Sequence, residues 1–366
     1  MVETGPKPLA LPLAGKTILL LPRYTATGPS SRLRMGQFVP LLEAAGATVR
    51  SEPFFDDAYL TQFFGSGQQS RTAALRGYSR RMRLLATVRA DMAWVERELF
   101  PFLPGRLETM LRWRRIPYVV DMDDAVFHRY DMHRSAAVRG VLGRKLVPLL
   151  RGAAAATMGN PYLVNYARSH GSKRVIDVPT VVDPDRYPLL PPPVGERLRL
   201  GWIGTPANAR YLDVVVEALR RLGPSVPVTL VTIGAPELPG LPVPQEAHAW
   251  SEDSEGPLLA GIDVGVMPLL DDPFERGKCG YKLIQYMAAG RAVIGSPVGV
   301  NADIITSDCG LLASSVEDWM EAIRTLAGDP EQRAAMGRAG RSRVEQHYAR
   351  NVIATKLITL FKEVMA

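Results

Sequence analysis

A proline-rich segment at residues 188–195, Pro-Leu-Leu-Pro-Pro-Pro-Val-Gly, constrains the fold of this 366-residue chain more than any other feature. Its composition excludes a helix or a central strand, so we interpret it as a linker. On both sides of it, short apolar runs alternate with segments of helical periodicity. This alternation predicts two doubly wound α/β domains, each a parallel sheet with covering helices, and a ligand cleft between them.

The apolar runs and the helical periodicity place the individual elements. We expect strands at residues 16–21, 47–50, 92–95, 117–120, 153–158, 175–178, 198–203, 228–233, 264–267 and 292–295. We expect helices in the second half at residues 211–222, 282–289, 316–327 and 330–346.

Composition and missing motifs exclude several classes of protein. No run of 18 uncharged apolar residues occurs, so no transmembrane helix is expected. Cys279 and Cys309 are the only cysteines, and their spacing fits neither a disulfide framework nor a metal site, which favours a cytoplasmic setting. Neither Gly-x-Gly-x-x-Gly nor Gly-x4-Gly-Lys-Ser/Thr follows a first strand, which argues against nicotinamide, flavin and P-loop enzymes.

The positive charge of the chain is concentrated in residues 71–115, where eleven arginines face four acids. Such a field attracts phosphates, and Trp94 and Trp113 in the same stretch suit a membrane interface. A solvated, arginine-rich helix face is the alternative interpretation. No helix-turn-helix, zinc finger or aromatic RNA-binding signature accompanies the basic residues, so a nucleic-acid partner is not expected.

The stretch from Asp263 to Asp303 carries the most specific pattern of the chain. It contains Gly-Lys-Cys-Gly-Tyr-Lys-Leu-Ile-Gln-Tyr-Met-Ala-Ala-Gly at residues 277–290. This pattern predicts a strand, a basic loop between glycines and a helix that begins near Gly280. The free amides of a helix start beside Lys278 and Lys282 form an anion site, whereas a plain turn with solvated lysines is the alternative.

This stretch resembles the nucleotide-sugar half of the GT-B glycosyltransferases, specifically glycosyltransferase family 4. Many members have two glutamates eight positions apart here, and this chain has Gly277 and Gln285 at those places. The resemblance implies that Gly280 and its neighbouring amides hold the donor phosphates, with Lys278 and Lys282 beside them. It also implies that Gln285 hydrogen-bonds the ribose hydroxyls of the donor.

A second stretch, Leu-Gly-Trp-Ile-Gly-Thr-Pro at residues 200–206, supports the resemblance. The family commonly has an arginine directly after Gly204 and a lysine six positions after it, which clamp the diphosphate; Thr205 and Arg210 take these places here. The resemblance implies that Gly204, Thr205 and Arg210 bind the donor, since a guanidinium can hold phosphate bidentately. An Arg210 that only caps a loop is the alternative.

The resemblance also implies a domain organisation. We expect an acceptor-binding domain at residues 1–190, a nucleotide-sugar-binding domain at 191–345, and a terminal helix at 346–366 that packs back on the first domain. The resemblance is good over residues 198–366 and extends to the first half only in architecture.

In the first half, Asp121-Met122-Asp123-Asp124 follows an expected strand, at the edge where α/β active sites lie. Three interpretations remain open: a metal site, a catalytic or sugar-orienting role for Asp121 and Asp123, and a structural role in capping or ion pairing. We favour the catalytic role and expect no metal site.

A loop at residues 27–34 follows the first expected strand. Its Gly28, Ser30, Ser31 and Arg32 are candidates for binding an acceptor or its phosphate, because small residues let the backbone approach a ligand. An ordinary helix cap by Ser30 or Ser31 is the alternative.

Together these features predict a retaining, metal-independent glycosyltransferase that needs no cofactor and uses a nucleotide diphosphate sugar as co-substrate. The acceptor would be a glycan or a lipid-linked glycan of exopolysaccharide or cell-envelope synthesis, and the cytoplasmic protein would contact the anionic inner membrane face. A nucleotide-sugar epimerase of the same fold and an inactive nucleotide-binding scaffold are the alternatives.

Overall fold

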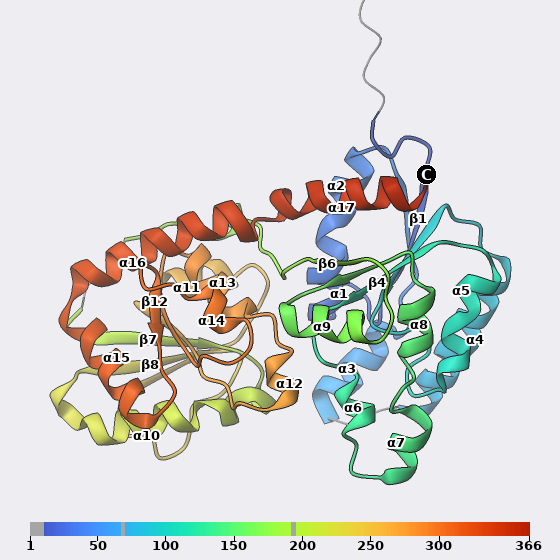
Figure 1. Cartoon of the computed structure of the whole chain (residues 1–366). Helices are drawn as coiled ribbons and strands as arrows, with labels where there is room; N and C mark the ends of the chain where they lie inside the picture. Colours follow the sequence, from blue (N-terminus) through green and yellow to red (C-terminus); the bar gives the residue numbers. More distant parts are fainter. Residues whose placement is uncertain (1–10, 67–69, 192–194) are drawn as a thin grey trace, which may run out of the picture. The chain divides into compact units, whose positions relative to one another are not determined.

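The computed structural model describes residues 11–66, 70–191 and 195–366. Part of the expected linker, residues 192–194, therefore lies outside the described residues. Contacts divide the chain into two compact units, Met1–Val178 with Ile353–Ala366 and Pro179–Val352. We call them the N-terminal and the C-terminal unit and describe each by itself (Figure 1).

The N-terminal unit is built on a six-stranded parallel sheet in the order β2-β1-β3-β4-β5-β6. Its strands β3 and β4 are buried along their whole length, as expected of central strands that are covered on both faces. The strands are β1 (Thr17–Leu21), β2 (Thr48–Ser51), β3 (Met92–Glu96), β4 (Tyr118–Met122), β5 (Ala155–Met158) and β6 (Val175–Asp177).

Short helices connect these strands and cover both faces of the sheet. The longest connecting helix, α4, begins at the cap residue Ser70, whose hydroxyl accepts a bond from the Ala73 amide (3.3 Å). The helices of this unit are α1 (Pro29–Arg34), α2 (Val39–Ala44), α3 (Asp57–Ser66), α4 (Arg71–Thr87), α5 (Met110–Trp113), α6 (His128–Asp131), α7 (Ala136–Leu142), α8 (Val147–Gly152) and α9 (Pro161–Ser169).

The last helix of the chain, α17 (Arg350–Val364), belongs to the N-terminal unit from Ile353 onward. The ring of Phe361 meets the ring of Trp94 on β3 edge-on, at 5.0 Å between centroids. Leu357, Leu360 and Phe361 are at most 2% exposed, so this helix completes the apolar core on one face of the first sheet.

The C-terminal unit also contains a six-stranded parallel sheet, in the order β12-β11-β10-β7-β8-β9. The predicted α/β fold class with two parallel sheets is confirmed. The edge strands β9 and β12 were not predicted. The strands are β7 (Leu198–Ile203), β8 (Val228–Ile233), β9 (Gln245–His248), β10 (Val264–Met267), β11 (Ala292–Gly295) and β12 (Gly310–Leu312).

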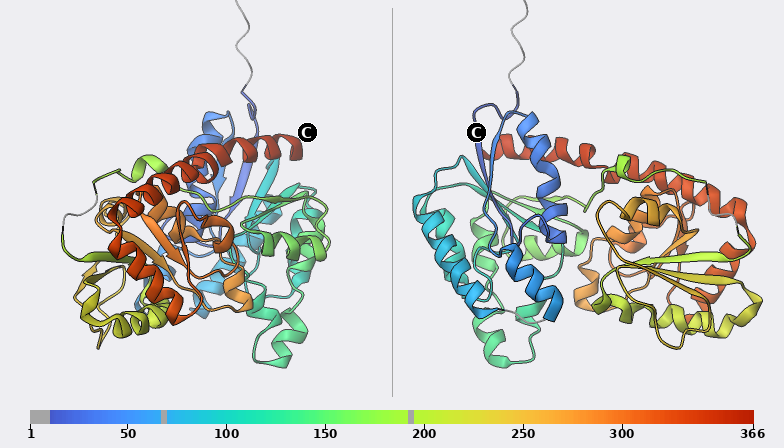
Figure 2. Two further views of the ribbon diagram at one scale, coloured as in Figure 1. Left: turned by 60° about the vertical axis from the view of Figure 1, so that its left-hand side comes forward. Right: turned by 180° about the vertical axis from the view of Figure 1, so that it is seen from behind.

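Alternating side chains of this sheet supply two separate apolar cores. Leu198 and Leu200 of β7 pack with α10 and α15, whereas Ile203 faces the core that contains α13. Figure 2 shows the helices on both faces of the sheet. They are α10 (Asp213–Leu222), α11 (Glu255–Ala260), α12 (Pro273–Arg276), α13 (Tyr281–Ala288), α14 (Asn301–Ile304), α15 (Val316–Gly328) and α16 (Pro330–Arg343).

In both sheets the strand order reverses at one point, between β1 and β3 in the first and between β7 and β10 in the second. The loops that leave the carboxyl ends of such strands diverge to opposite faces and leave room for a ligand. The candidate site residues therefore have to be sought at these two places.

Candidate active site

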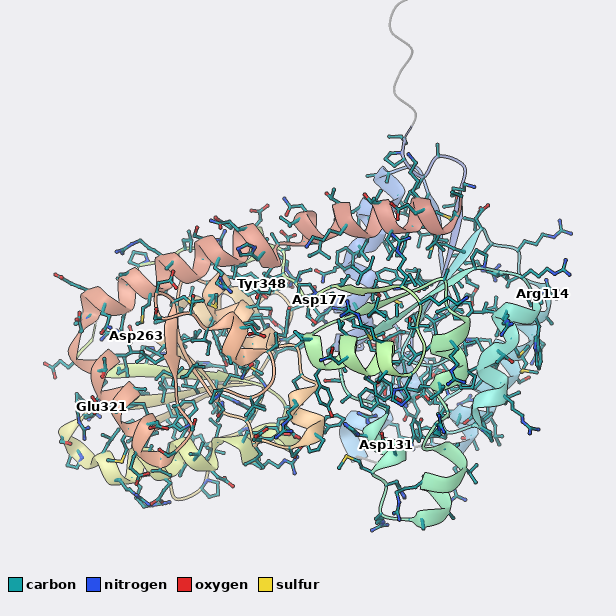
Figure 3. All side chains as sticks on the ribbon, viewed as in Figure 1. Arg114, Asp131, Asp177, Asp263, Glu321 and Tyr348 are labelled. Atoms are coloured by element: carbon teal, nitrogen blue, oxygen red, sulfur yellow. The ribbon has the colours of Figure 1, made fainter. Side chains whose placement is uncertain are left out.

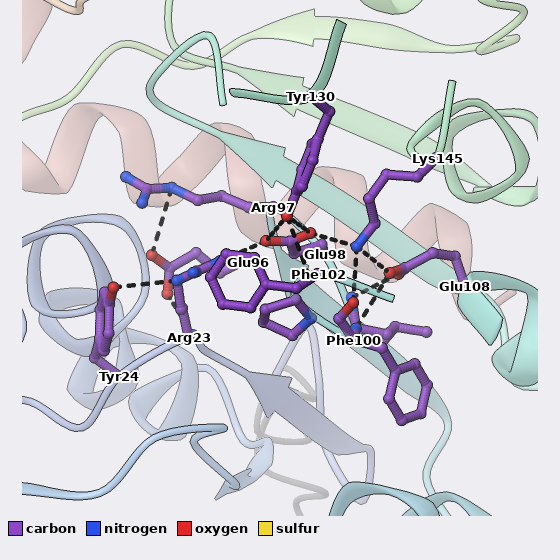
Figure 4. Close-up of polar contacts among 12 residues, drawn as sticks. Arg23, Tyr24, Glu96, Arg97, Glu98, Phe100, Phe102, Glu108, Tyr130 and Lys145 are labelled. Carbon is purple, nitrogen blue, oxygen red and sulfur yellow. Dashed lines mark hydrogen bonds and ion pairs between the residues drawn. The ribbon is translucent and has the colours of Figure 1, made fainter. Parts of the chain in front are cut away.

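The carboxyl ends of β1 and β3 carry a buried cluster of charged side chains (Figure 4). Arg23 lies after β1, and Glu96, Arg97 and Glu98 end or follow β3. All four residues are at most 4% exposed. This cluster lies where the strand order of the first sheet reverses.

Glu98 is the centre of this cluster. Its carboxylate accepts bonds from Arg23, from the Lys145 ammonium (2.6 Å) and from the Tyr130 hydroxyl (2.9 Å). Burial alone would raise the pKa of Glu98, but Lys145 and Arg23 outweigh burial and lower it to about 2. Lys145 also contacts the Glu108 carboxylate at 3.2 Å, so the buried charges form one connected network.

Arg97 holds the aspartates that follow β4. Its guanidinium donates to Asp123 at 2.7 Å, to Asp124 at 3.1 Å and to the Ser30 hydroxyl at 2.7 Å. The backbone of Arg97 has φ of 65°, in the left-handed region that residues other than Gly rarely adopt. Strain of this kind is maintained where the surrounding contacts fix it, frequently at functional sites.

Asp121 and Asp123 have different environments. Asp121 is fully buried, accepts two bonds from the Arg34 guanidinium (2.8 and 2.7 Å) and one from the Thr157 hydroxyl (2.6 Å). The Asp123 side chain is 13% exposed. Burial would raise the pKa of Asp123, but Arg97 and Arg34 outweigh it and hold this pKa below its ordinary value. Of the two carboxylates, Asp123 is therefore the one that reaches solvent, and its lowered pKa keeps it ionised.

The loop at residues 27–34 contributes its hydroxyls to the same cluster. The Ser31 hydroxyl bonds to Glu96 and accepts from the Tyr24 amide at 3.0 Å, and Ser30 bonds to Arg97. No side chain caps α1, and Gly28 at its start has no room for a side chain, since a Cβ would lie 2.4 Å from the Cβ of Tyr24. Arg32 is half-buried on α1.

Sequence reasoning missed most of this charged network, and it also assigned no role to His128. The His128 ring lies between the Asp131 carboxylate (2.8 Å from Nδ1) and the Tyr162 hydroxyl (2.7 Å from Nε2). Tyr162 comes 34 residues after His128, so no local spacing could have indicated this group.

In the C-terminal unit, helix α13 begins after Gly280, as the sequence predicts. Gly280 caps α13 with φ of 63°, and a Cβ at this position would lie 2.2 Å from Cδ1 of Ile304. The first amides of α13 have no acceptor inside the helix. Lys278 and Lys282 flank this helix start; the Lys282 ammonium lies 5.2 Å from the ring centroid of Trp202.

Arg210 is connected to the same loop through Tyr211 and Glu275. The Arg210 guanidinium donates to the Tyr211 hydroxyl at 3.2 Å, and that hydroxyl donates to Glu275. The Lys278 ammonium lies 5.8 Å from the ring centroid of Tyr211. Two segments, with Tyr211 and Glu275 64 residues apart in sequence, thus bring Arg210 and Lys278 to one ring.

Glu275 is a second residue that sequence reasoning missed. It is 2% exposed, and burial and the neighbouring Asp272 raise its pKa. One of its carboxylate oxygens is buried without a hydrogen-bond partner among the residues described. The signal that could have located it is the helix start Asp272-Pro273, which places Glu275 in the first turn of α12.

Gln285 and Gly204 complete the residues predicted for this unit. Gln285 is 3% exposed, and within the described ranges its side-chain amide makes no hydrogen bond to the protein. The amide atoms of Gln285 are not fully enclosed, so a ligand or water can reach them. Gly204 directly follows β7, and a Cβ at this position would lie 2.6 Å from the Trp202 indole; the exposed Thr205 comes next.

Residues 197–329 match the family model described as "Glycosyl transferases group 1". No curated protein matches the chain in sequence.

Three solved structures illustrate the similarity of fold. Sucrose-phosphate synthase from Thermosynechococcus elongatus is 15% identical with a TM-score of 0.70, over 95% of this chain and 99% of that chain. Anabaena HepE in complex with UDP-glucose is 14% identical with a TM-score of 0.69, over 95% of this chain and 100% of that chain. WaaG, a glycosyltransferase involved in lipopolysaccharide biosynthesis, is 16% identical with a TM-score of 0.67, over 94% and 99%.

These matches confirm the predicted GT-B fold. Together, the matched domain and the fold support a nucleotide-sugar-dependent glycosyltransferase.

Proposed function

We propose that the protein is a retaining enzyme of glycosyltransferase family 4 that transfers a sugar from a nucleotide diphosphate sugar without a metal ion. The observation that carries this proposal is the grouping of Arg210, Lys278 and the Gly280 helix start around Tyr211 and α13. Two cations and a helix N-terminus are the chemistry that binds a diphosphate. The similar HepE structure is a complex with UDP-glucose, which supports the same class of donor.

In this proposal the C-terminal unit stabilises the leaving diphosphate. Arg210 and Lys278 supply positive charge where negative charge develops, and the first amides of α13 donate to the phosphate oxygens. Gly204 and Thr205 line the approach to the nucleotide, Lys282 adds charge at the helix start, and the buried Gln285 amide bonds to the ribose. A phosphate oxygen of the leaving group accepts the acceptor proton, so no strong protein base is required.

The acceptor is proposed to bind the N-terminal unit at the carboxyl ends of β3 and β4. Asp123 is the residue suited to orient a sugar hydroxyl, because it is ionised and reaches solvent. Asp121 instead positions Arg34 with both of its oxygens. Ser30 and Ser31 hold Arg97 and Glu96, so the contribution of the loop is to position the aspartates.

A thermal-shift assay against UDP, GDP, ADP, CDP and dTDP, with and without magnesium, tests the donor proposal. A ligand at about 100 times its Kd adds about 2.7 kcal/mol to the free energy of unfolding. We expect one nucleotide to stabilise the protein equally with and without magnesium. No shift with any nucleotide would contradict the proposed donor site. A shift without any sugar transfer favours the inactive nucleotide-binding scaffold, and a new sugar nucleotide formed without an acceptor favours the epimerase.

Replacing Asp123 by Asn should lower kcat/KM for transfer about tenfold to a hundredfold, because a hydrogen bond to a charged group contributes about 1.5–3 kcal/mol. Steady-state kinetics with the identified donor measure this change. Donor binding in the thermal-shift assay should stay the same. Unchanged kcat/KM in the folded variant would show that Asp123 has no role in sugar transfer.

The proposed acceptor pathway is exopolysaccharide or cell-envelope synthesis at an anionic membrane surface. Among the described residues, no helix is both apolar and long enough to span a bilayer. On α4, however, Arg76 and Arg83 are exposed beside two exposed apolar side chains, Leu75 (65%) and Met82 (41%). A basic helix face with exposed apolar residues is typical of a peripheral membrane contact.

Arg81 does not belong to that exposed face, contrary to the expectation of a solvated arginine-rich surface. It is 2% exposed and donates to the Glu52 carbonyl at 3.0 Å. Burial and the neighbouring Arg80 lower its pKa to about 10. Replacing Arg81 would thus disturb the core and is unsuitable as a test of membrane binding.

Replacing Arg76 and Arg83 by Glu should weaken binding to phosphatidylglycerol vesicles about thirtyfold or more, at about 1 kcal/mol per removed basic residue. Vesicle sedimentation measures this loss. A matched variant with Glu at the exposed Arg197 and Arg338 of the C-terminal unit should retain binding. Equal binding of both variants would count against α4 as the membrane contact.

A further inference from the structure

Four cationic side chains line a pocket at the amino-terminal edge of the first sheet. Arg112 and Arg115 come from α5 and the turn before β4, Arg151 from the end of α8, and Lys173 from the segment before β6. The pocket has a volume of about 660 Å³. A strand of five residues spans about 16 Å, so this pocket is separate from the charged cluster at the carboxyl ends of the same strands.

The charge of this pocket is uncompensated. No carboxylate lines it. Within the described ranges, the side chains of Arg112, Arg115, Arg151 and Lys173 form no ion pair and no hydrogen bond with the protein. All four pocket cations are exposed, whereas the buried cations Arg23, Arg34 and Lys145 of this unit bond to carboxylates. Like charges without counter-charges repel one another, and a bound anion would relieve that repulsion.

Tight packing and a strained backbone fix the walls of the pocket. The Tyr118 hydroxyl donates to the Leu149 carbonyl at 2.8 Å, and a Cβ on Gly152 would lie 2.5 Å from that hydroxyl. The backbone of Arg115 adopts φ of 56°, a conformation rare for a residue other than Gly. The turn that presents Arg115 is therefore held in one conformation by its surroundings.

We propose that this pocket is a second anion site, separate from the donor site, which binds a phosphorylated ligand carrying at least two negative charges, such as a diphosphate group. Three guanidinium groups suit phosphate because each can donate two parallel hydrogen bonds. The volume admits a diphosphate together with the water that an open pocket retains. The same chemistry occurs in soluble diphosphates and in phosphorylated lipid headgroups.

The surroundings of the pocket suit a lipid headgroup as the source. Trp113, next to Arg112 on α5, is 69% exposed. Arg114 follows it at the outer edge of the N-terminal unit (Figure 3). The Arg114 guanidinium also donates to the Val88 carbonyl at the end of α4 (3.3 Å), which joins this edge to the basic face of α4. An exposed indole beside arginines is typical of a surface at the headgroup level of a membrane.

Calorimetric titration with inorganic pyrophosphate tests the proposal on the full chain. Replacing Arg151 and Lys173 by Gln should weaken pyrophosphate binding about thirtyfold, at about a factor of five per removed cation. A control variant with Gln at the exposed Arg197 and Arg338 should bind like the wild type. Because the proposed donor site also suits a diphosphate, the same comparison is made in the Arg210→Ala background, where binding at this pocket should persist. Equal affinity of Arg210→Ala with and without the Arg151 and Lys173 substitutions, or loss of all pyrophosphate binding in Arg210→Ala alone, would overturn the proposal.

Vesicles distinguish the two sources of the ligand. If a lipid headgroup occupies the pocket, the Arg151/Lys173 variant should sediment less than the Arg197/Arg338 control with phosphatidic acid vesicles, because a phosphomonoester headgroup can carry two negative charges. If the source is a soluble diphosphate, both variants should sediment equally while only the first loses pyrophosphate binding. Neither result depends on sugar transfer, so a failure of this proposal is distinct from a failure of the proposed function.

Discussion

Replacing Glu98 by Gln should lower the free energy of unfolding by about 3–5 kcal/mol at neutral pH, because it leaves buried cations without their counter-charge. Glu98 bonds to Arg23, Lys145 and Tyr130, and its side chain is only 3% exposed. Urea unfolding followed by circular dichroism measures the change. As a control, Glu321→Gln removes an exposed ion pair with Arg324 and should cost less than about 1 kcal/mol.

The effect of Glu98 on stability should depend on pH. Its pKa is about 2 in the folded protein and 4.5 ordinarily, so the ionised carboxylate stabilises the fold above pH 4.5. This stabilisation is lost as the pH falls from 4.5 toward 2. The stability difference between wild type and Glu98→Gln should therefore be constant from pH 5 to 7 and shrink below about pH 4.5. A difference that stays constant down to pH 3 would contradict the assignment of Glu98 as the ionised centre.

Replacing Arg210 by Ala should lower kcat/KM for donor turnover about a hundredfold to a thousandfold, the usual loss when one group that stabilises developing charge is removed. The fold should be unaffected, because the Arg210 side chain is 64% exposed. Release of the nucleoside diphosphate measures turnover with the donor identified by thermal shift.

The matched control is Arg220→Ala, which removes an arginine whose side chain is 55% exposed from α10 in the same unit. Its turnover should equal that of the wild type. Turnover that is insensitive to Arg210→Ala would place the diphosphate elsewhere and contradict the proposed role of Arg210.

The sequence predicted all strands of the first sheet and the central strands of the second, but it missed the two edge strands of the second sheet. The expected strands at 198–203, 228–233, 264–267 and 292–295 coincide with β7, β8, β10 and β11. These strands are mostly apolar, with Arg199 in β7 and Thr229 and Thr232 in β8 as exceptions, since central strands of a parallel sheet are buried on both faces. The missed β9 contains Gln245, Glu246 and His248, because an edge strand pairs on one side only and tolerates polar residues.

The residues of the candidate site were predictable where they lie together in one short segment of the sequence. Gly280, Lys278 and Gln285 lie within nine residues, and their pattern indicated a helix start with basic neighbours. The Glu98 network was not predictable, because Arg23 and Lys145 are 75 and 47 residues away from Glu98 along the chain. Only the order of the strands brings these residues together, and that order cannot be inferred from the periodicity of apolar residues in the local sequence.

The placement of α17 has a consequence for how the polypeptide matures on the ribosome. Residues 179–352 form a contiguous unit, whereas the apolar core on the first sheet is completed only by Ile353–Ala366. Until that helix has been translated, the Trp94 side chain lacks its contact with Phe361. The unit that begins first is therefore finished last, and a nascent chain stalled before residue 353 would present an uncovered apolar face to chaperones and proteases.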